Sequence, residues 1–387
     1  MSARVLFVTN GHGEAAIAER IALELLTFAP AARIDHLALV GNVSSDAMRA
    51  VGPRRAMPSG GLIAMGNVRN LAKDLSAGLL SLTLSQARFL RRARGAYDVV
   101  VAVGDAFALI MTLLVRARTV FVGTAKSVRV APYGPFETNL LRRAVACFVR
   151  DEATAEALRR RGVDAQVANA IVDLFAGPAD PAVEATVAGF APALALFPGS
   201  RESAYDDAAF LLEVTRELAL QYPTLGAVIS VAPGLDADRI ARDAACAGWD
   251  VHATADAAAP FAMSRGGREI VRGWRKGLGP LLERVVLVLG QAGTANEVAA
   301  AAGVPVVAFE SDRVRKASWY RRRQQDLLGE ALAVLPEERN AAVTGVREIL
   351  EDAQRRTRMA AVGRAQMGEA GGAARIGACI ALLAAGK

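Results

Sequence analysis

Short apolar runs alternate with amphipathic stretches along the chain, and this pattern predicts a parallel α/β fold. Residues 5–9 form an apolar run, and residues 15–28 carry apolar side chains three and four positions apart, as on one face of a helix. A second strand is expected at residues 35–40. Strands joined by a helix lie parallel in one sheet, so ligands are expected at the carboxyl ends of the strands.

The pattern then continues to the end of the chain and predicts two domains. Further strands are expected at residues 98–103, 120–122, 147–149, 167–170, 193–197, 227–231, 250–253 and 285–289, and in a run that reaches Phe309. Glycine, proline and alanine dominate residues 175–192, which is the best candidate for a boundary. We therefore expect one domain at residues 1–176 and another at 190–365.

The loop after residues 285–289 is suited to a phosphate. Gly290 ends the apolar run, a small polar loop follows, and an alanine-rich helix carries Glu297. Unpaired N–H groups and the helix dipole make such a helix start attractive to an anion. Gly290 and Gly293 can equally be there only to permit a tight turn. Glu297, about one turn into the helix, is placed to accept hydrogen bonds from a ribose diol.

A second loop of this kind follows the strand at residues 193–197. Its sequence is Pro-Gly-Ser-Arg, with Arg201 as the last residue. Exposed amides and a guanidinium at one point suit a pyrophosphate.

Three polar residues follow expected strands and are candidates for catalysis. Asp105 comes directly after the strand at 98–103 and can be a helix N-cap or a general base. His12 and Glu14 follow the first strand, where His12 can also be a turn residue without chemistry. Lys126, after the strand at 120–122, can contact a phosphate or only solvent, and it is counted among the expected membrane or acceptor contacts.

Residues 58–94 are apolar and bordered by arginine and lysine, which is typical of an amphipathic surface that rests on a bilayer. Leu62, Ile63 and Met65, next to glycines, are the residues most expected to enter lipid. The alternative is an ordinary helix packed on the sheet.

Composition supports two sizeable cores and an anionic partner. The 387 residues exceed one ordinary core, and 53% of them are hydrophobic, which excludes a disordered chain. The net charge of +7 favours phosphorylated metabolites, nucleic acid or an acidic membrane. Aromatic residues are only 5% and do not alternate with basic ones, which disfavours nucleic acid as a partner. The basic run at residues 313–323 is expected to be a solvated face.

Cysteine usage and apolar run lengths indicate a cytoplasmic protein that meets a membrane only at its surface. Cys147, Cys246 and Cys379 are too far apart for a disulfide framework or a zinc site. The N-terminus lacks the features of a secretory signal, and no uninterrupted apolar run reaches eighteen residues. No carboxylate cluster resembles a magnesium site, so the expected chemistry uses no metal and no cofactor.

Six motifs together identify a resemblance that spans most of the chain. They are NGHGE at 10–14, MPSGG at 57–61, AVGD at 102–105, VGTAKS at 122–127, FPGSRES at 197–203 and GQAGTANE at 290–297. In this order they resemble the glycosyltransferase family of lipid A disaccharide synthase, and more closely its lipid-A-disaccharide synthase-related branch.

The resemblance implies a GT-B fold, in which two Rossmann-like, doubly wound domains face a cleft. The C-terminal domain would hold a UDP-sugar, the N-terminal domain a lipid acceptor, and a last helix at 373–385 would return to the first domain. The implied enzyme is a metal-independent hexosyltransferase. It would move an N-acetylglucosamine-type or related hexose to a lipid or lipid-linked acceptor at the inner face of the cytoplasmic membrane.

The resemblance also assigns roles to individual residues. Against the UDP-sugar it places Gly199, Ser200, Arg201, Gln291, Gly293, Thr294, Asn296 and Glu297, with Glu297 on the uridine ribose. It makes Asp105 the base; by their chemistry His12 and Glu14 could also take the proton. The family has a small-residue loop with Glu, Ser and Asp where this chain has His12 and Glu14, so the acceptor and the sugar are open. A UDP-N-acetylglucosamine 2-epimerase and a non-catalytic, membrane-peripheral binder of nucleotide sugars remain alternatives.

Overall fold

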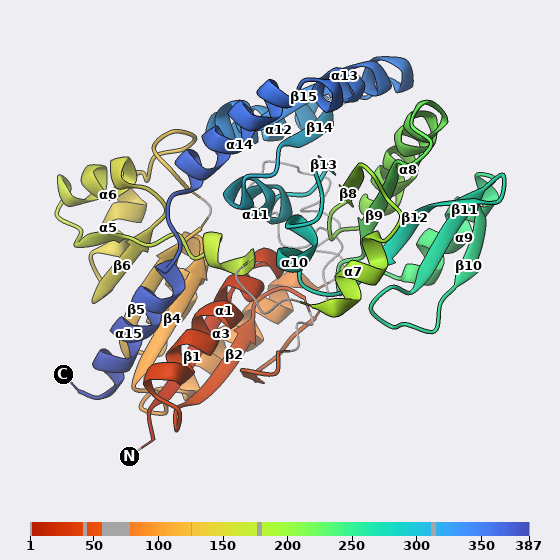
Figure 1. Ribbon diagram of the computed structural model, residues 1–387. Helices are drawn as coiled ribbons and strands as arrows, with labels where there is room; N and C mark the ends of the chain where they lie inside the picture. The colour runs from red at the N-terminus through yellow and green to blue at the C-terminus, as the bar shows by residue number, and fades with distance from the viewer. Residues whose placement is uncertain are drawn as a thin grey trace. The chain divides into compact units, whose positions relative to one another are not determined.

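The chain divides into two compact units, Met1–Asp173 with Glu369–Lys387, and Leu174–Gly368 (Figure 1). The computed structural model describes residues 2–41, 45–55, 78–124, 126–175, 180–310 and 315–386. Helix α7 (Pro181–Val187) belongs to the second unit, although the sequence predicts a boundary region there. It forms because Asp180 caps it and because Val183 and Thr186 are buried.

The first unit is built on a parallel sheet. Within the described residues, its strands follow the order β3-β2-β1-β4-β5-β6-β7, and every neighbouring pair is parallel. The strands are β1 (Arg4–Thr9), β2 (Arg33–Ala38), β3 (Arg49–Ala50), β4 (Val99–Gly104), β5 (Arg118–Gly123), β6 (Ala146–Val149) and β7 (Ala165–Val167). The helices are α1 (His12–Phe28), α3 (Leu79–Arg92), α4 (Ala106–Leu113), α5 (Pro135–Leu141), α6 (Glu152–Arg159) and α15 (Gly372–Ala384). A 3-10 turn, η2 (Val172–Phe175), lies where the first unit ends.

The last helix, α15, packs on α1 of this unit (Figure 1). Gly377 permits the close approach, because a Cβ there would lie 2.9 Å from the backbone nitrogen of Leu25. The carboxylate of Asp173 accepts the N–H groups of Gly371 at 2.6 Å and Ala373 at 2.7 Å, and so caps α15. The C-terminal segment is therefore bound to the first unit by packing and by a charged cap.

The second unit has a mixed sheet in the order β10-β11-β12-β9-β8-β13-β14-β15 within the described residues. The strands are β8 (Ala193–Phe197), β9 (Gly226–Ser230), β10 (Asp250–Ala253), β11 (Phe261–Arg265), β12 (Arg268–Trp274), β13 (Leu287–Gly290), β14 (Val306–Glu310) and β15 (Leu332–Pro336). The helices, besides α7, are α8 (Ala204–Gln221), α9 (Ala237–Cys246), α10 (Leu278–Leu282), α11 (Thr294–Ala302), α12 (Arg315–Leu328), η3 (Gly329–Ala331), α13 (Arg339–Glu351) and α14 (Ala353–Met367).

The hairpin of β11 and β12 corrects the expectation of a wholly parallel second sheet. Its strands pair antiparallel, and β10 joins them antiparallel at the edge. Gly266 and Gly267 form the turn with φ of +57° and +76°. Two adjacent left-handed residues define the type I′ turn that joins twisted strands, and a Gly-Gly pair between strand-like runs is its sequence signal.

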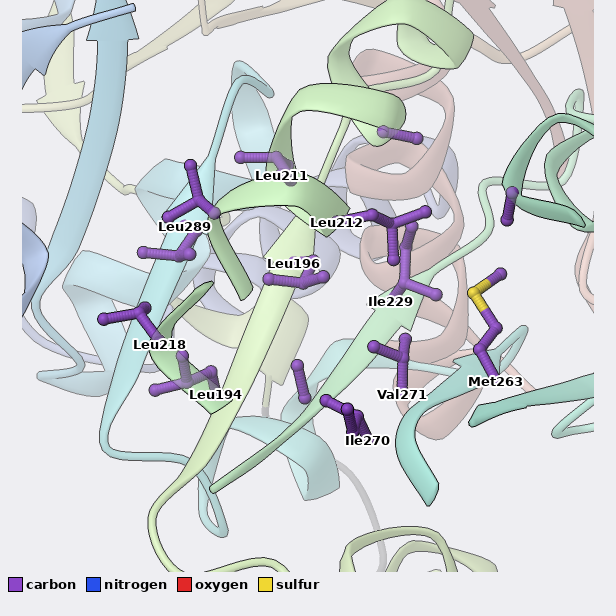
Figure 2. Packing of buried hydrophobic residues seen from close by; sticks show 14 of the residues in the cluster. Leu194, Leu196, Leu211, Leu212, Leu218, Ile229, Met263, Ile270, Val271 and Leu289 are labelled. Atoms are coloured by element: carbon purple, nitrogen blue, oxygen red, sulfur yellow. The ribbon is translucent and has the colours of Figure 1, made fainter. Parts of the chain in front are cut away.

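Aliphatic side chains from the sheet and α8 form the core of the second unit (Figure 2). Leu194 and Leu196 of β8 and Leu289 of β13 are fully buried beside Leu211 of α8. Burying a leucine side chain contributes roughly 1.5–3 kcal/mol. Packing against α8 thus stabilises the central strands β8 and β13. The loops of the candidate site follow these two strands.

By length and composition alone, one stretch of the described residues is apolar enough to cross a membrane, Ala353–Ala384. It consists of α14 and α15, which are separated by Gly368 and Gly371, both at positive φ. Helix α14 packs on α11 of the second unit, and α15 packs on α1 of the first. Each of the two helices therefore packs on a helix of its own unit.

A buried histidine makes the stability of the first unit depend on pH. His36 is 1% exposed, and its Nε2 lies 2.9 Å from the hydroxyl of Thr9. Burial, helped by the charge of Arg54, lowers the pKa of His36 from 6.5 to about 4. The fold therefore favours neutral His36, and this contribution is present above pH 6.5 and is lost as the pH falls toward 4.

We predict that His36→Gln removes this pH dependence. One pKa unit corresponds to about 1.4 kcal/mol, so wild type should lose on the order of 3 kcal/mol through His36 between pH 7.5 and 4. The measurement is the difference in free energy of unfolding between wild type and variant across that range. A difference that stays constant with pH would show that His36 does not titrate in this way.

Candidate functional site

Two loops of the second unit that the sequence predicts for a diphosphate lie side by side. Gly290 of β13 is in register with Phe197 of β8. The carbonyl of Phe197 accepts the N–H groups of Gln291 at 2.9 Å and of Ala292 at 3.1 Å. The loop after β8 and the loop after β13 are thus joined at the carboxyl edge of the sheet.

The loop after β8 exposes its polar residues. Gly199 has φ of +115°, a conformation that other residues rarely adopt. Ser200 and Arg201 follow and are exposed, and α8 begins at Ala204. An exposed guanidinium next to a glycine turn can pair with a phosphate.

The loop after β13 leads into α11, whose first residue is Thr294 and whose N-cap is Gly293. The carbonyl of Gly293 accepts the N–H groups of Asn296 and Glu297. Glu297 is the fourth residue of the helix and is partly exposed, as expected for a side chain one turn from the helix start. The roles of Gly293, Thr294 and Glu297 toward a nucleotide stay predictions.

The side chains of Gln291 and Asn296 support the loop from inside the unit. The Gln291 side-chain amide bridges to β14, where it accepts the N–H of Phe309 at 3.1 Å and donates to the Phe309 carbonyl at 3.2 Å. Asn296 is fully buried and donates to the Gly290 carbonyl at 2.9 Å. The sequence predicts both residues as nucleotide contacts, whereas these hydrogen bonds give their side chains a scaffolding role.

The basic run at residues 313–323 is not simply the solvated face expected from the sequence. Arg321 of α12 is only 7% exposed, and its guanidinium donates to the carbonyl and side-chain oxygens of Gln291. Sequence reasoning missed Arg321 because neighbouring arginines make the whole run appear exposed. Arg322, the next residue, is exposed.

Asp207 is a second residue near this edge that the sequence does not single out. It lies in the first turn of α8, and burial raises the pKa of its carboxyl to about 7 against the opposing charge of Arg321. Ser203 donates a hydrogen bond to it, and Glu337 and Asp206 are its negative neighbours. The fold favours protonated Asp207, so its contribution to stability is present at low pH and is lost as the pH rises toward 7.

In the first unit, Asp105 is the N-cap of α4, one of the two roles that the sequence leaves open, and its role as a base stays a prediction. Its Oδ1 caps α4 by accepting the N–H groups of Phe107 at 3.0 Å and Ala108 at 3.1 Å. Its Oδ2 accepts the side-chain amide of Asn10 at 3.0 Å. An ionised carboxylate can accept about four hydrogen bonds, so these contacts leave Oδ2 one further acceptor position.

Helix α1 begins at His12, three residues before the expected start. Glu14 is therefore at the third helical position, and its carboxylate lies against the N-cap Gly11, where a Cβ would be 2.4 Å from Oε2. Its stem also lies against Gly104, the residue before Asp105. A glutamate at this position typically returns to the N-cap, so the place of Glu14 suits a capping contact as well as the catalytic role predicted.

His12 is directed elsewhere. Its ring lies against Gly41, beyond the end of β2, where a Cβ would be 3.2 Å from Cε1. The structure thus brings Glu14 to the residue before Asp105, while His12 adjoins a different strand end.

Lys126 is paired. Its Nζ lies 2.6 Å from Oε2 of Glu137 and 5.7 Å from the ring centre of Tyr133. The sequence offers phosphate or solvent as its contact, and the structure adds an ion pair. The other expected membrane contacts, Leu62, Ile63 and Met65, lie outside the described residues.

Among the described residues, no group of three or more His, Cys, Asp or Glu side chains can hold a metal ion. Independence from metal stays a prediction.

Comparison with known proteins gives the fold. No family model and no curated protein matches the chain. Among solved structures, UDP-GlcNAc 2-epimerase from Neisseria meningitidis, bound to UDP-GlcNAc, is 13% identical, with a TM-score of 0.58 over 96% of this chain and 98% of that one. MurG from Acinetobacter baumannii is 13% identical, with a TM-score of 0.54 over 98% and 99%.

A UDP-glucosyltransferase from Polygonum tinctorium that glucosylates indoxyl is also 13% identical, with a TM-score of 0.56 over 100% of this chain and 99% of that one. Matches at such low identity establish architecture. The chain has the GT-B fold of two Rossmann-like α/β domains. The resemblance to lipid A disaccharide synthase stays a prediction.

We predict that Gly290→Ala destabilises the second unit by about 1–3 kcal/mol, because the new Cβ would lie 2.0 Å from Oδ1 of the buried Asn296. In an Asn296→Ala background the same change should cost less, since the overlap is gone. Denaturant unfolding of the four proteins measures this coupling. Gly277→Ala, with no atom within 4 Å of its Cβ, should cost less than about 1 kcal/mol. Additive costs at positions 290 and 296 would contradict the interpretation.

Proposed function

We propose that the protein is a glycosyltransferase that moves a hexose, of the N-acetylglucosamine type or related to it, from a UDP-sugar to a lipid or lipid-linked acceptor. The observation that carries the proposal is the junction of the two loops at Phe197, whose carbonyl accepts the amides of Gln291 and Ala292. It puts an exposed arginine, Arg201, on the same sheet edge as the start of α11. The named UDP-sugar enzymes with this fold support the choice of donor.

The second unit supplies the donor contacts in this proposal. The start of α11 at Gly293 and Thr294 attracts the negative diphosphate through its N–H groups and dipole. Arg201 adds a charged donor, and Glu297 accepts hydrogen bonds from the ribose hydroxyls. The same groups stabilise the charge that develops on the leaving diphosphate.

The first unit supplies the base. An acceptor hydroxyl attacks the anomeric carbon, a bond from its oxygen to that carbon forms, and the bond from the carbon to the UDP oxygen breaks. UDP leaves with the electron pair, and the hydroxyl proton passes to Asp105. The Oδ2 atom of Asp105 has an acceptor position left beside Asn10, which fits this task. Glu14 is the alternative base.

We also propose that the first unit meets an acidic membrane surface through α3. Leu80 and Leu84, one turn apart, are 63% and 49% exposed, and Arg88 continues the same exposed stripe. Arg91 and Arg92 follow, and α3 contains no acidic residue. Apolar side chains with a basic border suit the headgroup region of anionic lipids. In this proposal the enzyme acts from the cytoplasm at the inner face of the membrane.

A UDP-N-acetylglucosamine 2-epimerase is the enzymatic alternative, because such enzymes share the fold. Epimerisation needs no acceptor, whereas transfer does. Incubation with UDP-N-acetylglucosamine alone therefore separates the two reactions.

We predict that wild type transfers label from one member of a panel of UDP-hexoses, including UDP-N-acetylglucosamine, to a lipid extract of bacterial membranes. Asp105→Asn should keep the cap of α4 and bind the donor, yet lower transfer by about 100-fold or more, since an amide cannot take the proton. Scintillation counting of the lipid phase and calorimetric titration of the donor are the measurements. Unchanged transfer by Asp105→Asn would remove Asp105 from the mechanism, and a 2-epimer formed without lipid would favour the epimerase.

We predict that Leu80→Asp with Leu84→Asp reduces binding to vesicles of anionic phospholipid by at least about tenfold. Each substitution replaces an exposed apolar side chain with a negative charge that such a surface repels. Leu220→Asp is the matched control, because Leu220 is 73% exposed on α8 of the second unit. The readout is co-sedimentation with anionic and with neutral vesicles. If the double variant pellets as wild type does, α3 is not the contact.

A further inference from the structure

The four carbonyl groups of the loop Gly290 to Gly293 all accept hydrogen bonds from buried side chains. Asn296 donates to Gly290, and Arg321 donates to Gln291 at 3.2 Å. Gln324, also on α12, donates to Ala292 at 3.1 Å and to Gly293 at 3.3 Å. The loop is therefore held along its whole length from one side.

These donors form a connected network. The Oε1 atom of Gln324 accepts from Arg321 at 3.1 Å and from Asn296 at 3.3 Å. Arg321, Gln324 and Asn296 are 7%, 5% and 0% exposed. Buried side chains that are hydrogen-bonded to one another and to the loop restrict the orientation of each peptide in it, although Oδ1 of Asn296 accepts no hydrogen bond within the described part of the chain.

Fixing the carbonyls also fixes the amides. The C=O and N–H of a trans peptide point in opposite directions. Because the carbonyls of Ala292 and Gly293 face Gln324, the N–H groups of Gly293 and Thr294 are turned away from α12. Among the described residues neither N–H has an acceptor, whereas those of Gln291 and Ala292 donate to Phe197.

We propose that Arg321 and Gln324 are positioning residues, which hold the loop after β13 so that the N–H groups of Gly293 and Thr294 are aimed at the diphosphate of the donor. This inference rests on the proposed function, because it assumes that a diphosphate binds at the start of α11. Neither side chain touches the ligand, since both are buried behind the loop.

The role of Arg321 is geometric more than electrostatic. Its guanidinium donates in two directions, to Gln291 and to Gln324, as its planar, forked shape allows. Its positive charge also opposes the rise that burial causes in the pKa of Asp207. Arg321→Lys keeps the positive charge and removes the forked guanidinium, so it separates the electrostatic effect of Arg321 from the geometric one.

The test compares UDP with uridine, which lacks the diphosphate. Arg321→Lys and Gln324→Leu should each lower the preference for UDP over uridine by about tenfold or more, because misaligned amides weaken only the contacts to the charged group. Arg322→Met removes one charge from the exposed neighbouring position of the same helix and should leave the preference within about twofold. Calorimetric titrations give the affinities, and thermal melting identifies any variant that is unfolded.

The outcomes separate this inference from the proposed function. A wild-type protein that binds neither UDP nor inorganic pyrophosphate overturns both. A wild type that prefers UDP, together with folded Arg321→Lys and Gln324→Leu proteins that keep the full preference, overturns the positioning role alone. Equal losses for UDP and uridine also overturn it, since that is the signature of a general structural defect. If Arg321→Lys fails to fold, the preference of Gln324→Leu for UDP over uridine decides whether the positioning role holds.

Discussion

One backbone carbonyl, that of Phe197, organises the second unit. It accepts the amides of Gln291 and Ala292, so the loops after β8 and β13 form one surface instead of two independent turns. The proposed donor site depends on that junction, because Arg201 belongs to one loop and the start of α11 to the other. The leucines under β8 and β13 keep the two strands in register and thereby keep the carbonyl where both amides reach it (Figure 2).

Much of this arrangement could be predicted from the sequence. The strands at residues 193–197 and 250–253 have the predicted bounds, and for 193–197 the reason is a short apolar run bounded by loop residues. The sequence also predicts the GT-B fold, through the resemblance that six motifs in order carry. Ligands are expected at the carboxyl ends of parallel strands, and this expectation singles out Asp105, Arg201 and Glu297, which follow such strand ends. The last helix, expected at 373–385, is Gly372–Ala384 and lies on α1.

What the sequence could not provide depends on tertiary contacts. Arg321 looks like its neighbours in a basic run, and only its hydrogen bonds to the β13 loop show that it is buried. Gln291 and Asn296 belong to a motif suited to ligands, yet their side chains support the loop. In the first unit, Asp105 is both a cap and a carboxylate with an acceptor position left, so the structural and catalytic interpretations are compatible. The hairpin turn at Gly266 and Gly267 has a local sequence signal, the Gly-Gly pair, which the periodicity of hydrophobic residues does not reveal.

The most direct measurement is a crystal structure of the protein with UDP bound. The proposed donor site requires diphosphate oxygens within hydrogen-bond distance of the N–H groups of Gly293 and Thr294 and of the Arg201 guanidinium, with the ribose hydroxyls on Glu297. UDP bound at any other strand end, or a diphosphate that leaves those two amides unoccupied, would contradict it.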